Sequence, residues 1–301
     1  MKKNLKQSIF AIVAALIWGL AFVAQSSCAN IIDVFTFNFI RDIIAAIFLF
    51  IVILVLKIYH KKKKTEEVPI NYKKLIIGGV CCGILLFTAS CLQQYGIKET
   101  QAGKAGFLTS LYIVIVPILG LIFKKRVGIN VWISVLISLF GLYFLCIDSE
   151  FNISLYDSMI ILCAFIFSAH ILSIDYFSKG INSIYLSFVQ FVVGSIIAGI
   201  LMLIFENPNI NTIIECIIPL LYVGIMSSGV AYTLQILAQK DSNPTVISLL
   251  LSLESVFSVI GGLIILGDNL SLKEYIGCIF MLIAVVLAQI PIKYKRKKQQ
   301  I

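Results

Sequence analysis

Long apolar runs, separated by short polar segments, repeat along the whole chain. A helix needs about 20 apolar residues to cross roughly 30 Å of hydrocarbon, and ten segments approach or reach that length. They run near residues 8–25, 34–56, 75–95, 105–123, 130–147, 156–174, 183–205, 213–236, 245–266 and 272–290. The sequence lacks the alternating segments of about ten residues that form membrane β-barrels. The pattern therefore predicts an all-α integral membrane protein with ten transmembrane helices.

The composition supports a membrane protein and excludes an ordinary soluble domain. Apolar residues make up 60% of the chain and charged residues 13%, whereas soluble domains are about half apolar and a quarter charged. The net charge of +9 lies mainly in short clusters between apolar runs. That placement is typical of membrane orientation, so we expect no nucleic-acid partner. The first run, after MKKNLKQ, is too long for a cleavable signal peptide and is predicted to be the first span.

The sequence contains no motif for a cofactor, a metal or a catalytic centre. No phosphate-binding GxxxxGK[ST], HExxH or GxSxG pattern occurs in a suitable context. The eight cysteines form neither a CxxC pair nor a cluster with histidine, so neither zinc nor a disulfide framework is indicated. They are Cys28, Cys81, Cys82, Cys91, Cys146, Cys163, Cys216 and Cys278. We therefore expect no bound cofactor or metal, and no enzyme activity.

Positive charges are divided unevenly between the two sets of loops. With the N-terminus in the cytoplasm, the basic clusters all fall on the cytoplasmic side, and the opposite loops carry Lys98 and Lys104. The clusters comprise Lys2, Lys3, Lys6, Lys57, Lys61 to Lys64, Lys73, Lys74, Lys124, Lys125, Arg126, Lys293, Lys295, Arg296, Lys297 and Lys298. This asymmetry follows the positive-inside rule. We expect a protein of the cytoplasmic membrane with both termini in the cytoplasm.

The chain matches itself at an offset of 142 residues. Residues 89–122 align without a gap with residues 231–264 at about a dozen identical positions, among them Gln93/Gln235 and Ser110/Ser252. Apolar segments match one another easily, but here polar positions coincide as well. A weaker match at offset 149 sets Arg41 against Gln190. We therefore divide the chain into repeat 1, residues 1–148 with helices 1–5, and repeat 2, residues 149–301 with helices 6–10 and a basic cytoplasmic tail.

Each half has five spans, an odd number, so its two ends lie on opposite sides of the membrane. Two similar halves that follow each other in the chain must therefore have opposite orientations. Inverted repeats are the architecture of secondary transporters, which bind their substrate between the halves near the middle of the membrane. The repeat therefore predicts transport by alternating access around a cavity lined by spans 1–4 and 6–9, with spans 5 and 10 at the periphery.

Several segments resemble the EamA-type permeases of the drug/metabolite transporter superfamily. They are ALIWGLAFVAQ (15–25), NFIRD (38–42), GKAGFLTSLYIVIVPILG (103–120), AYTLQILAQK (231–240) and SLESVFSVIGGLIILGDNLSLKEYIG (252–277). The similarity covers nearly the whole chain and implies a ten-span, two-repeat permease for amino acids, other metabolites or drugs. Relatives tend to have proline after the glutamate of the ninth span, where this chain has Ser255, so a proline kink beside Glu254 is not implied. They tend to have glutamate where this chain has Asp268, which keeps the charge.

Glu254 interrupts the apolar ninth span about 14 Å from its start, at 1.5 Å of rise per residue. A charge at such depth costs about 2.5 to 3.5 kcal/mol on insertion scales, so the side chain is expected to face protein or water. It shares a face with Ser258 and Gly261, which suits close packing or a lined cavity. Two interpretations stay open: a proton carrier or substrate ligand, and a structural carboxyl bonded to a neighbouring helix.

Arg41 lies inside the second span, with Asn38 three residues before it. Arginine can hold a carboxylate through two parallel hydrogen bonds, which suits an amino-acid-like or acidic solute. The alternative is a structural arginine that reaches the interface or is neutralised by Asp42. Because Arg41 and Asp42 are adjacent, we expect their side chains to point in different directions and not to pair.

Polar residues in other spans complete the candidate site. Ser228, Tyr232, Gln235 and Gln239 recur at helical spacing and predict one polar stripe, with Gln93 as the counterpart of Gln235 in repeat 1. His170 is either a group that titrates near neutral pH or a neutral hydrogen-bond partner between helices. Trp18, Phe22, Tyr112 and Tyr232 are candidates for a pocket wall or for ordinary packing, and the repeat sets Tyr112 opposite Glu254. The candidate substrate or coupling residues are Glu254, Arg41, Asn38, Gln93, Gln235, Tyr232, Tyr112, His170, Gln190 and Trp18.

These observations favour a secondary active permease for a small organic metabolite such as an amino acid. Its expected partners are that solute, the lipid bilayer and a proton or another coupling ion. An exporter of cationic amphiphiles, with Glu254 as the counter-ion, is the alternative within transport. A membrane-embedded enzyme or a lipid-handling protein is a more distant alternative. The sequence does not determine the substrate, the direction of transport, the coupling ion or the oligomeric state.

Overall fold

The computed structural model describes residues 2–63, 71–100, 102–122, 127–146, 154–240, 242–266 and 271–290. Within these ranges the chain is helical and forms no strand, which confirms the all-α prediction. The first half contains α1 (Lys2–Cys28), α2 (Val34–Lys63), α3 (Tyr72–Ile97), α4 (Ala102–Ser110), α5 (Tyr112–Ile122) and α6 (Ile129–Cys146). The second half begins with α7 (Leu155–Phe177), α8 (Ser183–Phe205), α9 (Ile210–Glu215) and α10 (Ile217–Leu221). It continues with the π-helix η1 (Tyr222–Ala231), α11 (Tyr232–Gln239), α12 (Pro244–Leu251), α13 (Glu254–Gly261), the π-helix η2 (Gly262–Leu266) and α14 (Leu272–Gln289).

Eight helical stretches among the described residues are long and apolar enough to cross a membrane. They are Leu5–Cys28, Val34–Lys63, Tyr72–Ile97, Ala102–Ile122, Leu155–Phe177, Ser183–Phe205, Ile217–Gln239 and Pro244–Ile264. The predicted fifth and tenth spans form shorter apolar helices, Ile129–Phe144 and Tyr275–Gln289. The protein is thus a multi-pass membrane protein, and the count of ten spans stays a prediction.

Some of the features predicted from the sequence lie outside the described residues. They are Lys64, the basic cluster 124–126, the loop 148–153, Asp268 and the basic tail 293–298.

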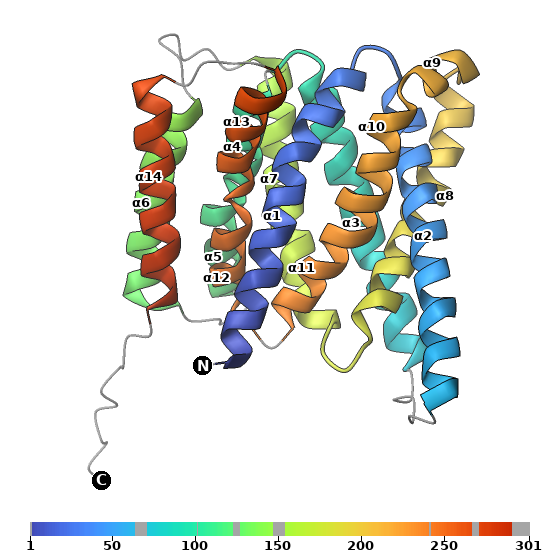
Figure 1. Cartoon of the computed structure of the whole chain (residues 1–301), viewed down its shortest axis with the longest axis horizontal. Helices are drawn as coiled ribbons and strands as arrows, with labels where there is room; N and C mark the ends of the chain where they lie inside the picture. The colour runs from blue at the N-terminus through green and yellow to red at the C-terminus, as the bar shows by residue number, and fades with distance from the viewer. Residues whose placement is uncertain are drawn as a thin grey trace.

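Three contacts between helix ends fix the directions of the helices. Asn30 Nδ2, just after α1, donates to the carbonyl oxygen of Lys98, just after α3, at 3.3 Å, so α1 and α3 end on the same side. On that side Thr100 Oγ1 donates to Asp157, at the beginning of α7. At the other end, Lys74 in α3 contacts the carbonyl oxygen of Lys179, just after α7. The first helices of the two halves, α1 and α7, therefore run in opposite directions, as inverted repeats require (Figure 1).

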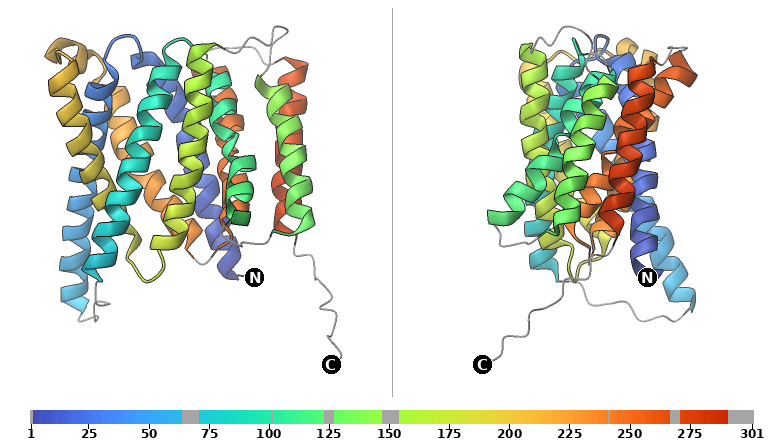
Figure 2. Two further views of the ribbon diagram at one scale, coloured as in Figure 1. Left: turned by 180° about the vertical axis from the view of Figure 1, so that it is seen from behind. Right: turned by 90° about the vertical axis from the view of Figure 1, so that its left-hand side faces the viewer.

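The helices of the two halves interleave. Between the halves, α3 packs against α7 and α8, α2 against α8, and α1 against α13. By contrast, α6 and α14 pack mainly against each other and form a pair at one side (Figure 2). This position agrees with the expectation that the fifth and tenth apolar segments are peripheral.

A glycine permits the close approach of α1 and α13. A Cβ atom added at Gly19 would lie 2.5 Å from the Cβ of Phe257 and 2.8 Å from the carbonyl oxygen of Glu254. Both contacts are too short for real atoms, so the backbones can approach this closely only because residue 19 has no side chain. This approach places the beginning of α13, and with it Glu254, directly beside α1.

The fourth and ninth apolar segments are both interrupted at equivalent positions of the repeat. The first breaks between α4 and α5 at Leu111, and the second breaks between α12 and α13 at Ser252 and Leu253. In each copy a serine, Ser110 or Ser252, comes directly before the leucine at the break. The hydroxyl of Ser252 donates to the carbonyl oxygen of Leu249 at 2.8 Å. Such bonds compete with the helical backbone pattern and often bend helices. The helix is therefore interrupted beside Glu254 although this chain has Ser255 where relatives tend to have proline.

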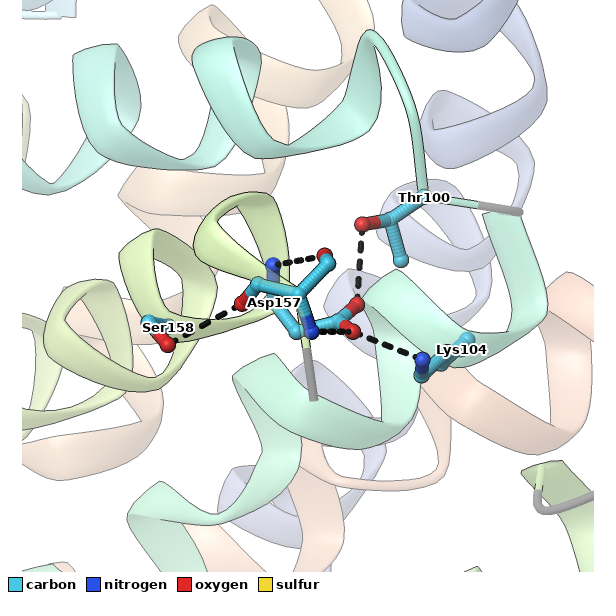
Figure 3. Close-up of polar contacts among 5 residues, drawn as sticks. Thr100, Lys104, Asp157 and Ser158 are labelled. Carbon is cyan, nitrogen blue, oxygen red and sulfur yellow. Dashed lines mark hydrogen bonds and ion pairs between the residues drawn. The ribbon is translucent and has the colours of Figure 1, made fainter. Parts of the chain in front are cut away.

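Asp157 connects the two halves at the end of the bundle where α7 begins (Figure 3). Its side chain accepts a hydrogen bond from the backbone nitrogen of Ser154 at 2.8 Å, and Ser154 Oγ accepts one from the nitrogen of Asp157 at 3.1 Å. This capping box satisfies two of the free amide groups at the start of the helix. The same carboxylate also accepts from Thr100 at 3.0 Å and forms an ion pair with Lys104 at 2.7 Å. One side chain thus caps α7 and joins it to the loop and helix of the first half.

We predict that Asp157→Asn destabilises the protein more than Ser158→Ala. The first change removes the charge that Lys104 and the beginning of α7 require, and loss of such a cap costs about 1 to 2 kcal/mol. The second removes only the exposed hydrogen bond from Ser158 Oγ to the carbonyl oxygen of Ser154. Melting of the purified variants in detergent should show a decrease of several degrees for Asp157→Asn alone. Equal melting temperatures for the two variants would contradict this role of Asp157.

Candidate functional site

A cavity of about 520 Å³, including its open part, lies between the two halves. Seven of the residues around it come from the first half: Trp18, Phe22, Gln25, Arg41, Gln93, Thr109 and Tyr112. Seven come from the second half: Phe167, Ile171, Ser227, Tyr232, Gln235, Leu251 and Glu254. Neither α6 nor α14 contributes to this lining. Like the pockets that hold small organic ligands, the cavity combines aromatic walls with a few polar groups.

Glu254 and Tyr112 meet in this cavity across the boundary between the halves. Tyr112 Oη donates to Glu254 Oε1 at 2.8 Å, and both side chains are almost fully buried. They occupy equivalent positions of the repeat, and each is the first residue of the helix after its break. The partial positive charge at the beginning of a helix favours a carboxylate at its first residue. Glu254 thus faces the protein and the cavity, as the cost of a charge in lipid requires.

Arg41 also faces the cavity, and its pairing differs from our prediction. We expected Arg41 and Asp42 to point apart because they are adjacent, and this prediction was wrong, whereas the alternative in which Asp42 neutralises Arg41 agrees with the contact. The flexible arginine side chain folds back, so that its Nε donates to Asp42 Oδ1 at 2.9 Å and its Nη2 lies 2.9 Å from the same oxygen. Arg41 is 4% exposed and Asp42 is 1% exposed. A buried charge needs a close partner, and that requirement outweighs the different initial directions of the two side chains.

Aromatic rings form the wall beside these charges. The rings of Trp18 and Tyr232 are 4.7 Å apart between centroids, and Trp18 Nε1 donates to the carbonyl oxygen of Ser227 at 3.2 Å. Phe22 follows Trp18 by one helical turn and lies on the same face of α1. The rings come from α1 and α11 and the carbonyl group from η1, so the wall joins both halves of the protein.

The two glutamines that the repeat makes equivalent both line the cavity. Gln93 Nε2 donates to Thr109 Oγ1 at 3.1 Å, which connects α3 with α4. Gln235 Oε1 is buried and makes no hydrogen bond with the described residues. A buried amide oxygen without a partner carries a desolvation cost, and a ligand donor or a water molecule in the cavity would remove that cost.

Three predicted site residues do not line the cavity. Asn38 donates to the carbonyl oxygen of Val34 within its own helix at 2.8 Å. His170 Nε2 and Gln190 Oε1 lie 3.2 Å apart in a fully buried contact between α7 and α8. The edge of the His170 ring also packs against Tyr232, with 6.0 Å between ring centroids. His170 and Gln190 therefore lie behind the aromatic wall, and the other predicted side chains form the cavity itself.

The predicted polar stripe is shifted because residues 222–231 form a π-helix. A π-helix has more residues per turn than an α-helix, so positions before and after it no longer share one face. Tyr232 and Gln235 line the cavity, but Ser227 replaces Ser228 there. Gln239 instead donates to the carbonyl oxygen of Ile171 at 3.3 Å and connects α11 with α7.

Sequence reasoning missed several residues of the lining. Gln25 follows Trp18 and Phe22 at the spacing of one helix face, so the stripe in the first apolar run was a usable signal. Thr109 lies one turn before Tyr112, on the other side of the helix break. Phe167, Ile171 and Leu251 are apolar residues among many, and no pattern distinguishes them from the rest of their helices.

No group of three or more histidine, cysteine or acidic side chains among the described residues could hold a metal ion. Seven cysteines have a free thiol in the described part of the chain: Cys28, Cys81, Cys82, Cys91, Cys163, Cys216 and Cys278. The arrangement of the cavity instead offers a guanidinium group, a carboxyl group and amides to a small organic molecule.

Comparison with known proteins gives matches along the whole chain. The EamA-like transporter family matches twice, over residues 5–147 and 154–289. A protein of Archaeoglobus fulgidus named as an uncharacterized transporter is 30% identical over 290 residues, which cover 96% of this chain and 87% of that protein. Proteins with the same description from Methanothermobacter thermautotrophicus and Clostridium kluyveri are 23% and 25% identical over 93% and 94% of this chain. A crystal structure with 14% identity superposes at a TM-score of 0.75, with 94% of this chain and 96% of the other covered, and shows the same fold.

We predict that Tyr112 and Glu254 are energetically coupled. Tyr112→Phe removes the donor and Glu254→Met removes the acceptor, and the double variant should lose about 1 kcal/mol less than the sum of the single losses. The apparent free energy of unfolding in mixed detergent micelles measures this coupling.

Ser168→Ala provides the control for this measurement. The Ser168 hydroxyl is buried but donates to the carbonyl oxygen of Ala164 within α7, so its loss should add independently to that of Tyr112→Phe. Additive losses for the Tyr112 and Glu254 pair as well would contradict the proposed contact between the halves.

Proposed function

The chain belongs to the EamA-like transporter family and is a membrane transporter of a small-molecule solute, and we propose that it carries zwitterionic amino acids by secondary active transport. The observation that supports this proposal is the presence of Arg41 and Glu254 in one cavity. A guanidinium group can hold a carboxylate, and a carboxylate can hold an ammonium group. The two side chains come from opposite halves of the protein, so a zwitterion would bind to both at once.

The remaining lining suits an amino acid with an apolar side chain. Trp18, Phe22 and Tyr232 provide aromatic surface, and Phe167 and Ile171 extend it on α7. Gln235 Oε1 has no partner among the described residues and is available to the ammonium group. Tyr112 donates to Oε1 of Glu254, and a substrate ammonium group would bind to the same carboxylate.

The position of the cavity supports alternating access. It lies between inverted halves, and the two interrupted helices begin again at Tyr112 and Glu254 on its surface. Interrupted helices and binding at a repeat interface are recurrent features of secondary transporters. In our proposal the halves rock around the bound solute, while α6 and α14 stay at the side.

We further propose that the protein lies in the cytoplasmic membrane with its basic end inside. The end of α2 carries His60, Lys61, Lys62 and Lys63, and α1 begins and α14 ends at the same end of the bundle (Figure 1). Cytoplasmic segments are enriched in lysine and arginine, so both termini would be cytoplasmic.

A second candidate is export of cationic amphiphiles, and the contact of Glu254 with an aromatic-walled cavity favours it. A buried carboxylate and tryptophan or tyrosine faces both attract an organic cation. Arg41 distinguishes the two candidates, because its guanidinium group attracts a substrate carboxylate and repels an organic cation.

We predict that amino-acid exchange requires both charges, whereas export of an organic cation requires only one. Proteoliposomes loaded with unlabelled L-leucine, L-phenylalanine, L-glutamate or L-lysine should take up the same labelled compound, with the apolar pair favoured. Arg41→Gln and Glu254→Gln should each lower this counterflow at least about tenfold, since each removes a charge-assisted bond worth about 1.5 to 3 kcal/mol. Ser168→Ala, whose hydroxyl bonds within α7, should exchange like the wild type.

Tetraphenylphosphonium provides the contrast. If its transport depends on Glu254 but not on Arg41, and no amino acid exchanges, the amino-acid proposal is wrong and the cation exporter is correct. If Arg41→Gln exchanges L-leucine like the wild type, carboxylate recognition by Arg41 is wrong.

A further inference from the structure

We infer that Asp42 couples transport to protons: the substrate carboxylate replaces Asp42 on Arg41, and the released Asp42 takes up one proton. This inference rests on the proposed function, since it requires a solute with a carboxylate. It assigns a role to a residue that does not line the cavity and that our sequence analysis treated only as a neutralising neighbour of Arg41.

The contact between Arg41 and Asp42 is incomplete, which makes it replaceable. Nε and Nη2 of Arg41 both approach Oδ1 of Asp42, at 2.9 Å each. Oδ2 of Asp42 is buried and has no hydrogen-bond partner among the described residues. In the strong geometry of such pairs, two parallel bonds join two nitrogens to two oxygens. A substrate carboxylate that approaches from the cavity can adopt this geometry, whereas a side chain on the neighbouring residue does not.

When Arg41 pairs with the substrate, Asp42 has no other positively charged partner among the described residues. Arg41 is the one basic group that contacts it among the described residues. Among the titratable groups of other helices that interact with its charge are Cys91 on α3 and Tyr232 on α11, and neither is a cation. On α8, the residue beside Oδ2 is Gly194: a Cβ atom added there would lie 2.5 Å from that oxygen. The second-half helix therefore presents backbone and no charge to Asp42.

A buried carboxylate without a cation is far less stable than its protonated form. When the substrate takes over Arg41, Asp42 therefore takes up a proton, and its charge is neutralised. When the substrate leaves on the other side, Arg41 pairs with Asp42 again and the proton is released there. The proton and the substrate thus move in the same direction, and each cycle carries one positive charge with a zwitterion.

The steps balance without any further reactant. Before binding, Arg41 and Asp42 together are neutral. After binding, the guanidinium neutralises the substrate carboxylate, the substrate ammonium lies at Glu254, and Asp42 carries the proton. The inference thus gives both the coupling ion and its stoichiometry.

The test uses full-length protein in proteoliposomes with a pH dye inside and the membrane potential clamped by potassium and valinomycin. With the interior one pH unit more alkaline, the wild type should accumulate labelled L-leucine up to about tenfold, because one pH unit is a factor of ten in proton activity.

Asp42→Asn keeps a hydrogen-bond acceptor beside Arg41 but cannot take up a proton. It should retain L-leucine counterflow within about threefold and lose accumulation completely, so that its inside-to-outside ratio stays near one.

Asp42→Glu, which restores the acid, should restore accumulation. A further measurement needs no variant: L-leucine added outside wild-type liposomes, without a pH gradient, should acidify the interior. The inference is overturned if Asp42→Asn accumulates L-leucine like the wild type, or if net uptake of L-leucine by the wild type occurs without proton movement. Absence of wild-type counterflow of every amino acid would overturn the proposed function, and this inference with it.

Discussion

The hydrogen bond from Tyr112 to Glu254 joins equivalent positions of the two halves at the centre of the bundle. A carboxyl group at this depth is tolerated only where protein or water surrounds it. In an inverted repeat, equivalent residues that lie near the symmetry axis also lie near each other, so one half can satisfy a polar group of the other. The cavity, the helix breaks and the close approach of α1 at Gly19 all lie around this contact.

The buried polar groups around this contact form two layers, one at the cavity and one behind it. Arg41, Gln235 and Glu254 lie at the cavity, and behind them His170 and Gln190 connect α7 with α8. Because the halves interleave instead of lying side by side, each charged group at the cavity is supported by helices of both. Movement of one half against the other would therefore change the environment of all these groups together.

Much of this site could be predicted because polar residues within apolar spans are few and costly, so each one is conspicuous. Gln93, Gln235 and Glu254 were found by that signal and by the repeat. The pairing of Arg41 with Asp42 was not, since adjacent positions on an ideal helix point apart and only the long arginine chain permits the contact. The π-helix at residues 222–231 was also invisible, because hydrophobic spacing assumes one period throughout. It moved Ser227 to the cavity in place of Ser228.

Labelling of single cysteines by a water-soluble thiol reagent tests most directly whether a hydrated cavity lies between the halves. In a background without native cysteines, Gln93→Cys and Gln235→Cys should react, and a transported solute should slow both reactions. Ile47→Cys on α2, where the native side chain is 56% exposed on the outside of the bundle, should stay unreactive in lipid. If Ile47→Cys reacts and neither Gln93→Cys nor Gln235→Cys does, residue 47 faces water and the two glutamines do not. That result would contradict a hydrated cavity between the halves.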